Sequence, residues 1–279
     1  MPRALWSGSL TFGLVNIPVR LHSAVRDIRP RFRLLHRKDD APISYQKVCQ
    51  REGKPVAWED LVKGYEYEKG RFVVLTRDDF ETAALEKSRS VEILDFVEGA
   101  EIDTRYFDVP YYIVPDKGAG HAYAVLRDAL KRTGRVGIAR IILRQVQHLA
   151  AVLVVQEALV LCLLRFADEI VDIASVPLPE RERVNTREVK LAQMLIDSLA
   201  AEWEPEKYRD EYRDNLMRII NAKKKGRTAR LKSDTPDRDT KVVDLMERLQ
   251  KSLEASQPPR KRRTTRTRTS KRGRKASAA

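Results

Sequence analysis

The stretch from Leu149 to Leu164 constrains the fold of this chain most, because it is almost entirely apolar and consists mainly of Val and Leu. It is shorter than the roughly 18 residues that a membrane-spanning helix requires. Val and Leu in a short apolar run are typical of buried strands. This stretch therefore predicts a β-rich core, either a barrel or a sandwich.

Other segments show the same preference for β structure. From Leu5 to His22, short apolar runs alternate with the turn residues Gly8, Gly13 and Pro18. Further predicted strands of the same β body are Phe72–Leu75, Val91–Val97, Tyr106–Val114 and Gly137–Leu143. The aromatic residues expected in the core, rather than as stacking platforms, are Trp6, Phe12, Phe107, Tyr111 and Tyr112.

One helix is predicted among these strands, from His121 to Thr133. Its apolar residues recur at helical spacing, and Gly134 follows at the position where a left-handed residue commonly ends a helix. The first part of the chain is thus expected to be a β body with one helix packed against it.

The net charge of the chain is concentrated in its last part. Lys and Arg number 54 against 40 Asp and Glu, and residues 221–279 hold 20 of the basic but only 6 of the acidic side chains. From Gln257 to Ala279 there are ten Lys or Arg, no acid and no large apolar residue, which predicts a disordered basic tail. Such a tail favours a polyanionic partner, although a role in solubility alone is the alternative. Its densest basic stretch is Arg260, Lys261, Arg262 and Arg263.

The segment from Arg31 to Glu68 differs from the β body because it is polar and lacks a strong apolar period. Its basic residues are Arg31, Arg33, Arg37, Lys38, Lys47, Arg51, Lys54 and Lys63, and its aromatic residues include Tyr45, Trp58, Tyr65 and Tyr67. A long segment without secondary structure is usually functional or disordered, and aromatic residues argue against plain disorder. We expect an excursion from the core that follows a phosphate backbone. Interspersed acids leave a solvated charged loop as the alternative.

After Pro177 and Pro179 the pattern becomes helical. Asn185 and Glu188 have the spacing of a capping box, and the apolar face that follows them predicts a first helix. That face is formed by Val189, Ala192, Ile196 and Leu199.

Pro205 is expected to open a second helix, because proline is favoured in the first helical turn. Its apolar stripe is Tyr208, Tyr212, Leu216, Ile219 and Ile220, and it ends at Lys223, Lys224 and Lys225. These lysines either complement the helix dipole or contact DNA. Residues 226–238 form a predicted linker and 239–254 a short amphipathic helix.

Patterns that would indicate an enzyme are missing. The sequence has neither a Walker phosphate loop nor a dinucleotide-binding glycine pattern, and Lys38-Asp39-Asp40-Ala41 is only a near miss to a nucleotidyl transferase motif. The acid pairs Asp78-Asp79 and Asp237/Asp239 lie in predicted turns or linkers. Cys49, Cys162 and the four histidines are scattered without metal-ligand spacing. We therefore expect no cofactor, no metal and no catalytic residue.

Several motifs resemble those of the bacterial Ku family, in the family's order. The opening signature is Arg-Ala-Leu-Trp-Ser-Gly-Ser-Leu-Thr-Phe-Gly-Leu-Val-Asn-Ile-Pro-Val-Arg at residues 3–20. It is followed by similar blocks at Leu35–Asp39, Val62–Tyr67, Glu86–Arg89, Ile93–Phe96, Tyr112–Lys117, Gly134–Arg144, His148–Ala151, Leu164–Glu169 and Glu206–Arg213. The resemblance extends from residue 3 to about residue 225.

This resemblance implies a Ku-type β-barrel at residues 1–180, with an extended arm at about 31–68 that forms a dimeric ring around a double-stranded DNA end. A helical C-terminal region at 181–225 and a linker, short helix and basic tail at 226–279 would follow. The implied phosphate contacts inside the ring are Arg31, Arg37, Lys38, Lys47, Lys63, Arg140 and Arg144. Lys223–Lys225 and Arg260–Arg263 are further candidates for DNA binding.

The resemblance also implies a homodimer that works in non-homologous end joining and recruits the ATP-dependent DNA ligase D. Tyr208, Tyr212 and Arg213 fall in the region similar to the family's ligase-recruiting segment; packing within the dimer is the alternative role. The expected location is cytoplasmic and nucleoid-associated. The competing hypothesis from another class is a nucleoid-type architectural protein that coats duplex DNA.

Two departures from the family pattern matter. Where many relatives carry Cys-x-x-Cys-Gly, this chain has Cys49-Gln50-Arg51-Glu52-Gly53, which removes even a partial metal motif. After His148–Ala151 the family's Arg-Pro and Gly turn is replaced by a run containing Leu153, Val154 and Glu157. The second departure leaves open the hairpin geometry around this point.

Overall fold

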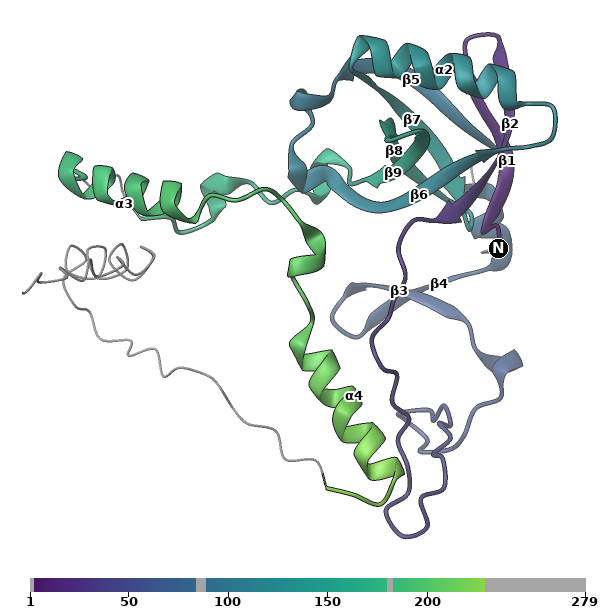
Figure 1. The fold of residues 1–279 in the computed structure, drawn as a ribbon. Helices are drawn as coiled ribbons and strands as arrows, with labels where there is room; N and C mark the ends of the chain where they lie inside the picture. The colour runs from purple at the N-terminus through teal and green to yellow at the C-terminus, as the bar shows by residue number, and fades with distance from the viewer. Residues whose placement is uncertain (1–2, 84–88, 180–182, 229–279) are drawn as a thin grey trace, which may run out of the picture. The chain divides into compact units, whose positions relative to one another are not determined.

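Seven strands of the described chain close into a barrel in a computed structural model that describes residues 3–83, 89–179 and 183–228 (Figure 1). Around the barrel the strand order is β1-β2-β6-β9-β8-β7-β5, and β5 returns to pair with β1. The strands are β1 (Trp6–Phe12), β2 (Val15–Ser23), β5 (Ser90–Glu98), β6 (Phe107–Pro115), β7 (Arg135–Leu143), β8 (Val146–Val155) and β9 (Ala158–Leu164). The prediction of a β-barrel is therefore confirmed.

Alternation along the strands fills the barrel with aliphatic side chains. In β2, Ile17, Val19 and Leu21 are buried while the residues between them are more exposed. Every other residue of an antiparallel strand points to the same face, so this pattern aims one set of side chains inward. The β1–β5 pair is parallel and all other barrel pairs are antiparallel.

The apolar run from Leu149 to Leu164 forms two strands rather than one. Val155 pairs with Ala158 across a two-residue turn in which Gln156 has a φ of 54°. The hairpin geometry left open by the departure from the family pattern is thus a tight turn, and most of β9 is buried. Two-residue hairpin turns need a left-handed residue of this kind to match the twist of the strands.

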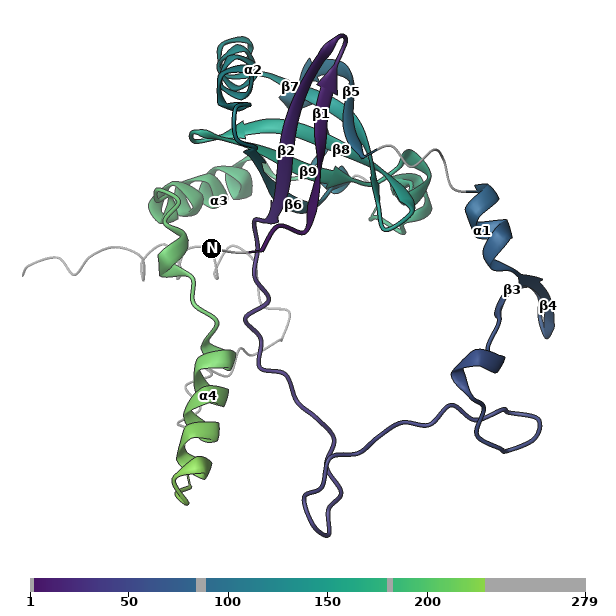
Figure 2. The same ribbon diagram turned by 90° about the vertical axis from the view of Figure 1, so that its right-hand side faces the viewer.

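Helix α2 (Gly120–Thr133) covers one end of the barrel (Figures 1 and 2). Its buried residues Tyr123, Leu126 and Leu130 belong to the same hydrophobic cluster as the barrel interior. Gly134 ends the helix with a φ of 68°, as predicted, and its N–H bonds to the carbonyl of Leu130. The end of the barrel at which β6 finishes and β7 begins is closed by this helix.

Between β2 and β5 the chain leaves the barrel for a long segment that contains the predicted arm, and its described residues are 24–83 and 89. Its regular elements are a 3-10 turn η1 (Trp58–Asp60), strands β3 (Lys63–Glu68) and β4 (Arg71–Leu75), and helix α1 (Arg77–Ala83). Strands β3 and β4 form a separate two-stranded sheet. The prediction that Phe72–Leu75 belongs to the barrel is wrong, because its hydrogen-bonding partner is the arm segment Lys63–Glu68.

The described chain contains further short 3-10 turns and two more helices. The turns are η2 (Gly99–Glu101), η3 (Thr104–Tyr106), η4 (Ala167–Glu169), η5 (Ile173–Ser175) and η6 (Pro205–Lys207), and the helices are α3 (Thr186–Leu199) and α4 (Glu211–Lys224). The chain divides into two units at Pro177, with α3 and α4 in the second. No helix of the described residues is long and apolar enough to cross a membrane.

The predicted start of the second C-terminal helix is wrong. Pro205 begins only the short turn η6, and α4 begins at Glu211, where the side chain of Asp210 accepts a hydrogen bond from the Arg213 N–H. Aspartate at this position satisfies a helix N–H that would otherwise lack a partner. Tyr208 consequently lies before the helix. The Asn185 cap of α3 is confirmed, because its side chain accepts from the Arg187 N–H.

Candidate nucleic-acid interface

Arg37 and Lys38 lie at the tip of a closed loop in the arm. The His36 N–H donates to the Ala41 carbonyl at 2.8 Å, and the Asp40 N–H returns to the His36 carbonyl at the same distance. Asp40 has a φ of 55°, which allows the chain to reverse here. Among the described residues, neither the Arg37 nor the Lys38 side chain forms an ion pair. The loop, which also contains Asp39 and Asp40, therefore exposes two cations that form no ion pair with the described residues.

The lysines Lys47 and Lys63 are held against aromatic rings. The ammonium nitrogen of Lys47 lies 3.6 Å from the centroid of the Trp58 ring, and that of Lys63 lies 4.3 Å from the Phe80 centroid. A cation over an aromatic face gains about 0.5–1 kcal/mol at an exposed site. The rings favour these positions of both ammonium groups without neutralising their charge.

Arg31 and Arg140, in contrast, already have carboxylate partners. Arg31 pairs with Asp27 at 3.5 Å in the arm, and Arg140 of β7 pairs with Glu92 of β5 at 2.9 Å on the outside of the barrel. Both pairs are largely exposed, so each contributes little to stability. A phosphate would have to compete with the carboxylate for these two arginines.

Basic and acidic residues are unevenly distributed along the arm, which a count over the whole arm does not reveal. Residues 24–54 contain nine Lys or Arg and four Asp or Glu, whereas residues 55–83 contain four basic and seven acidic residues. The limb that leaves the barrel is therefore cationic and the returning limb is anionic. A count over shorter windows of the sequence would have found this asymmetry.

The arm also exposes large apolar side chains. Phe32, Leu34 and Val62 are each about two thirds exposed or more, and Tyr45 and Trp58 are more exposed still. Single exposed apolar residues are common on protein surfaces, but a continuous series of them marks an interaction surface. The arm thus has the composition of a segment that a partner covers.

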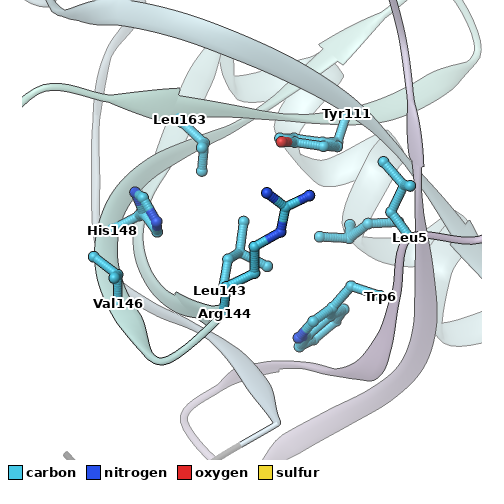
Figure 3. A pocket seen from close by; sticks show the side chains of 9 residues that line it. Leu5, Trp6, Tyr111, Leu143, Arg144, Val146, His148 and Leu163 are labelled. Atoms are coloured by element: carbon cyan, nitrogen blue, oxygen red, sulfur yellow. The ribbon is translucent and has the colours of Figure 1, made fainter. Parts of the chain in front are cut away.

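Arg144 lies in the turn between β7 and β8 and projects into a cavity at the open end of the barrel (Figure 3). The cavity has a volume of about 420 Å³. It is lined by Leu5, Trp6, Leu21, Tyr111, Leu143, Arg144, Val146, His148 and Leu163. Trp6 and Tyr111, predicted as core residues, are half-buried in this lining, while Tyr112 is 44% exposed and its prediction as a core residue is wrong.

The second unit carries an exposed aromatic pair next to the predicted partner-binding residues. The rings of Trp203 and Tyr208 stack at 5.0 Å with an interplanar angle of 23°. Tyr212 is 78% exposed in the first turn of α4, and Arg213 forms a 3.3 Å ion pair with Asp214. These side chains provide an aromatic surface beside mixed charges.

Lys223, Lys224 and Lys225 lie at the carboxyl end of α4, as predicted, where Lys223 and Lys224 complete the last helical turn. Cations there interact favourably with the exposed carbonyls. The Lys225 N–H donates to the Ala222 carbonyl at 3.0 Å. The other basic candidates, Arg260–Arg263, and the predicted 239–254 helix lie outside the described residues.

Asp78 and Asp79 lie in the first turn of helix α1, so their prediction as turn residues outside a helix is wrong, and Asp79 has a structural role there. Asp79 accepts hydrogen bonds from both the hydroxyl and the N–H of Thr76 at 2.7 Å, which hold the pKa of the Asp79 carboxyl below its usual value. Burial raises the pKa of the Cys162 thiol.

In residues 3–83, 89–179 and 183–228, no group of three or more His, Cys, Asp or Glu is placed to hold a metal ion.

Comparison with known proteins connects this geometry to one family. The family model of the Ku70/Ku80 beta-barrel domain matches residues 11–191. The "Non-homologous end joining protein Ku" of Opitutus terrae is 43% identical over 99% of this chain and all of its own length. The proteins of the same name from Bacillus subtilis and Pseudomonas aeruginosa are 40% and 36% identical, each over 91% of this chain and 83% and 88% of their own lengths.

Proposed function

Because the chain belongs to the family of bacterial non-homologous end joining proteins named Ku, we propose that it is a homodimeric clamp that binds the ends of double-stranded DNA. The arm carries this proposal. It departs from a closed barrel after Ser23 and returns at Ser90, and β1 is the single strand that separates these two points in the barrel order. A long segment anchored at both ends of its length by a rigid barrel is suited to enclosing a rod-shaped ligand.

The exposed apolar residues of the arm support a homodimer. In a two-fold symmetric dimer the same surface of each subunit meets its copy, so one apolar arm provides both halves of the interface. Tyr45, Trp58 and Val62 would lose their contact with water on pairing, and burial of apolar area is the main favourable term in such association. Two arms and two barrels would then complete a ring.

The cationic limb of the arm supports binding to the phosphate backbone. Arg37 and Lys38, together with Lys47 and Lys63 held near their aromatic rings, offer charges that can bind phosphates of any DNA sequence. Arg144 at the barrel mouth adds a cation on the side from which the arm departs. Lys223–Lys225 and the basic stretch Arg260–Arg263 would add sequence-independent affinity, which rises as condensed counterions are released.

The second unit is the candidate for recruiting the ATP-dependent DNA ligase D. The stacked Trp203–Tyr208 pair, Tyr212 and Arg213 have the aromatic and arginine composition that is enriched where proteins bind one another. The clamp itself would hold and bridge DNA ends in the nucleoid without a catalytic step of its own. The ligase would supply the chemistry.

The deciding experiment compares binding of the full chain to one duplex in linear and covalently closed circular form, over a series of salt concentrations. A ring loads only at an end and slides off short linear DNA, so strong preference for the linear form is expected. Blocking both ends of the linear duplex after loading should trap the protein at high salt. Equal affinity for linear and circular DNA would overturn the clamp and favour a protein that coats duplex DNA.

A further inference from the structure

Both limbs of the arm are attached to the barrel at its open end. Strand pairing places the start of β1, the end of β2, the start of β5 and the turn between β7 and β8 at this one end. The other end is covered by α2. If the arm encloses DNA, as proposed above, the open end lies next to the DNA path.

Gly8 allows the ring of Trp6 to lie across this open end. Both residues belong to β1 and, being two positions apart, point to the same face. A Cβ atom on Gly8 would collide with the indole ring of Trp6 and with the backbone carbonyl of Arg89. The missing side chain therefore leaves room for an aromatic wall of the cavity, opposite Tyr111 of β6 (Figure 3).

Arg144 occupies a backbone position that its residue type disfavours. Arg144 and Gln145 are the two residues of the β7–β8 turn and have φ values of 52° and 70°. Such turns favour Asn and Gly, because a side chain is strained at positive φ. The turn nevertheless carries arginine, and its guanidinium points into the middle of the cavity between Tyr111 and Trp6 (Figure 3).

The Arg144 guanidinium has no anion of its own. In the described parts of the chain it forms neither an ion pair nor a hydrogen bond, and the lining around it is mainly aliphatic and aromatic. Arg140, four residues earlier in the chain, has Glu92 as its partner, as Arg20 has Asp116. A cation above an apolar cavity without a carboxylate is suited to a ligand that has both an apolar body and a negative charge.

We propose that this cavity binds a nucleotide, with the phosphate on Arg144 and the base against the aromatic rings of Trp6 and Tyr111. A planar base gains about 1–3 kcal/mol by stacking on aromatic side chains, and arginine can meet two phosphate oxygens at once. The Tyr111 hydroxyl and the His148 ring supply hydrogen-bonding groups to the edge of the base. The cavity volume lies in the roughly 300–1,000 Å³ range of small-ligand pockets.

Two ligands share this chemistry. One is an unpaired terminal nucleotide of the bound DNA end, and the other is a free nucleotide. Binding of the first ligand rests on the proposed clamp, since the DNA end must pass the open end of the barrel. It would give a non-specific clamp a way to detect a short overhang. The second ligand would make the cavity a site for an effector of the clamp.

The test uses 2-aminopurine, a fluorescent base that is quenched on stacking, with the full-length protein. In a first experiment 2-aminopurine is the unpaired terminal nucleotide of a duplex, and in a second experiment it is the free deoxynucleoside monophosphate. We expect quenching by the unaltered protein and at least about a tenfold weaker response for Arg144→Asn, which removes the charge but suits the turn. Trp6→Leu should abolish the quenching of 2-aminopurine, because it removes the ring on which the base stacks while the cavity wall stays apolar.

The matched control is Arg135→Asn, at the start of the same strand β7 but at the opposite end of the barrel. The Arg135→Asn variant should quench the 2-aminopurine fluorescence as strongly as the unaltered protein does. Quenching only at the DNA end identifies the terminal nucleotide, and quenching of the free nucleotide identifies the second ligand. Absence of quenching in both experiments, or quenching that Arg144→Asn does not change, overturns the proposal.

Failure of the clamp is separable from failure of the nucleotide site. Equal binding of linear and circular DNA together with Arg144-dependent quenching of the free nucleotide would remove the clamp and leave the site. Preference for linear DNA without Arg144-dependent quenching would leave the clamp and remove the site.

Discussion

The hydroxyl oxygen of Tyr123 in α2 accepts a hydrogen bond from the backbone N–H of Leu159 in β9, at 2.7 Å and away from water. This bond joins the helix that covers one end of the barrel to strand β9, 36 residues further along the chain. A buried N–H without a partner is costly, so the helix is fixed in place by a polar contact as well as by apolar packing.

Replacing Tyr123 by Phe should lower the free energy of unfolding by about 1–2 kcal/mol. The ring would still fill its place, but the Leu159 N–H would lose its acceptor in a buried position. Urea denaturation at neutral pH measures the change. The control is Tyr112→Phe, because Tyr112 is 44% exposed and its replacement should change the stability by less than about 0.5 kcal/mol.

Glu157 in the β8–β9 turn should make stability depend on pH. Lys131 of α2 donates to its carboxylate at 2.6 Å, and this hydrogen bond, with the charges of Lys131 and Arg127, holds the pKa of Glu157 below its ordinary value. The stabilisation is therefore present above the unfolded-state pKa and is lost as the pH falls through the lower folded-state pKa.

Glu157→Gln should accordingly have a lower Tm than the unaltered protein at pH 7 and low salt, and the two Tm values should converge in acid. Thermal unfolding over a pH series measures this difference. High salt should reduce it at pH 7, because the pair is exposed. A difference that stays constant from pH 7 to below pH 3 would contradict the ion pair as its cause.

Replacing both Arg37 and Lys38 by Gln should flatten the salt dependence of DNA binding. Each phosphate that a cation neutralises adds about 0.9 to the slope of log K against log salt, so the slope should fall by about 1.8. Fluorescence anisotropy on a short duplex measures it. Arg77→Gln is the matched control, since Arg77 also lies in the arm but pairs with Glu81 at 3.0 Å. Equal slopes for all three proteins would remove the loop tip from the interface.

Deleting Gln257–Ala279 should weaken DNA binding and reduce its salt dependence while leaving dimerisation unchanged. The deleted segment contains ten Lys or Arg and no acid, and it lacks the large apolar residues that a dimer interface needs. Binding isotherms at several salt concentrations and sedimentation of the free protein measure the two effects. A tail that serves only solubility would leave the salt slope as it was.

The barrel could be predicted from the sequence because its signal is local. Short apolar runs with turn residues between them gave most of the barrel strands, and Gly134 marked the end of α2 through its left-handed backbone. The β3–β4 sheet could not be predicted, because Phe72–Leu75 is as apolar as a barrel strand while its partner Lys63–Glu68 is polar. Pairing between strands is a backbone property that side-chain patterns do not record.

The site was predictable only as a set of cations. Whether a cation is already paired, as Arg140 is with Glu92, depends on residues 48 positions apart in the sequence. The cavity at Arg144 depends on barrel closure, which brings Trp6 and Tyr111 to the same opening. The start of α4 was misjudged because Pro205 and Asp210 are both accepted start signals and only the second one caps a helix.

The pairing of β1 with β5 and of β2 with β6 also has a consequence for the order in which we expect the barrel to assemble. The Thr11 hydroxyl donates to the Val91 carbonyl across 80 residues of sequence, and the whole arm lies within that interval. Bringing the ends of so long a loop together costs entropy before any contact compensates for it, although each doubling of the loop adds only about 0.6 kcal/mol. Hairpins such as β7–β8 and β8–β9 form from neighbouring residues and can assemble early, whereas the β1–β5 and β2–β6 pairs, which both enclose the arm in sequence, close late. Until both pairs form, the newly made protein carries unpaired strand edges, so the arm sets the interval during which the nascent barrel is open to aggregation.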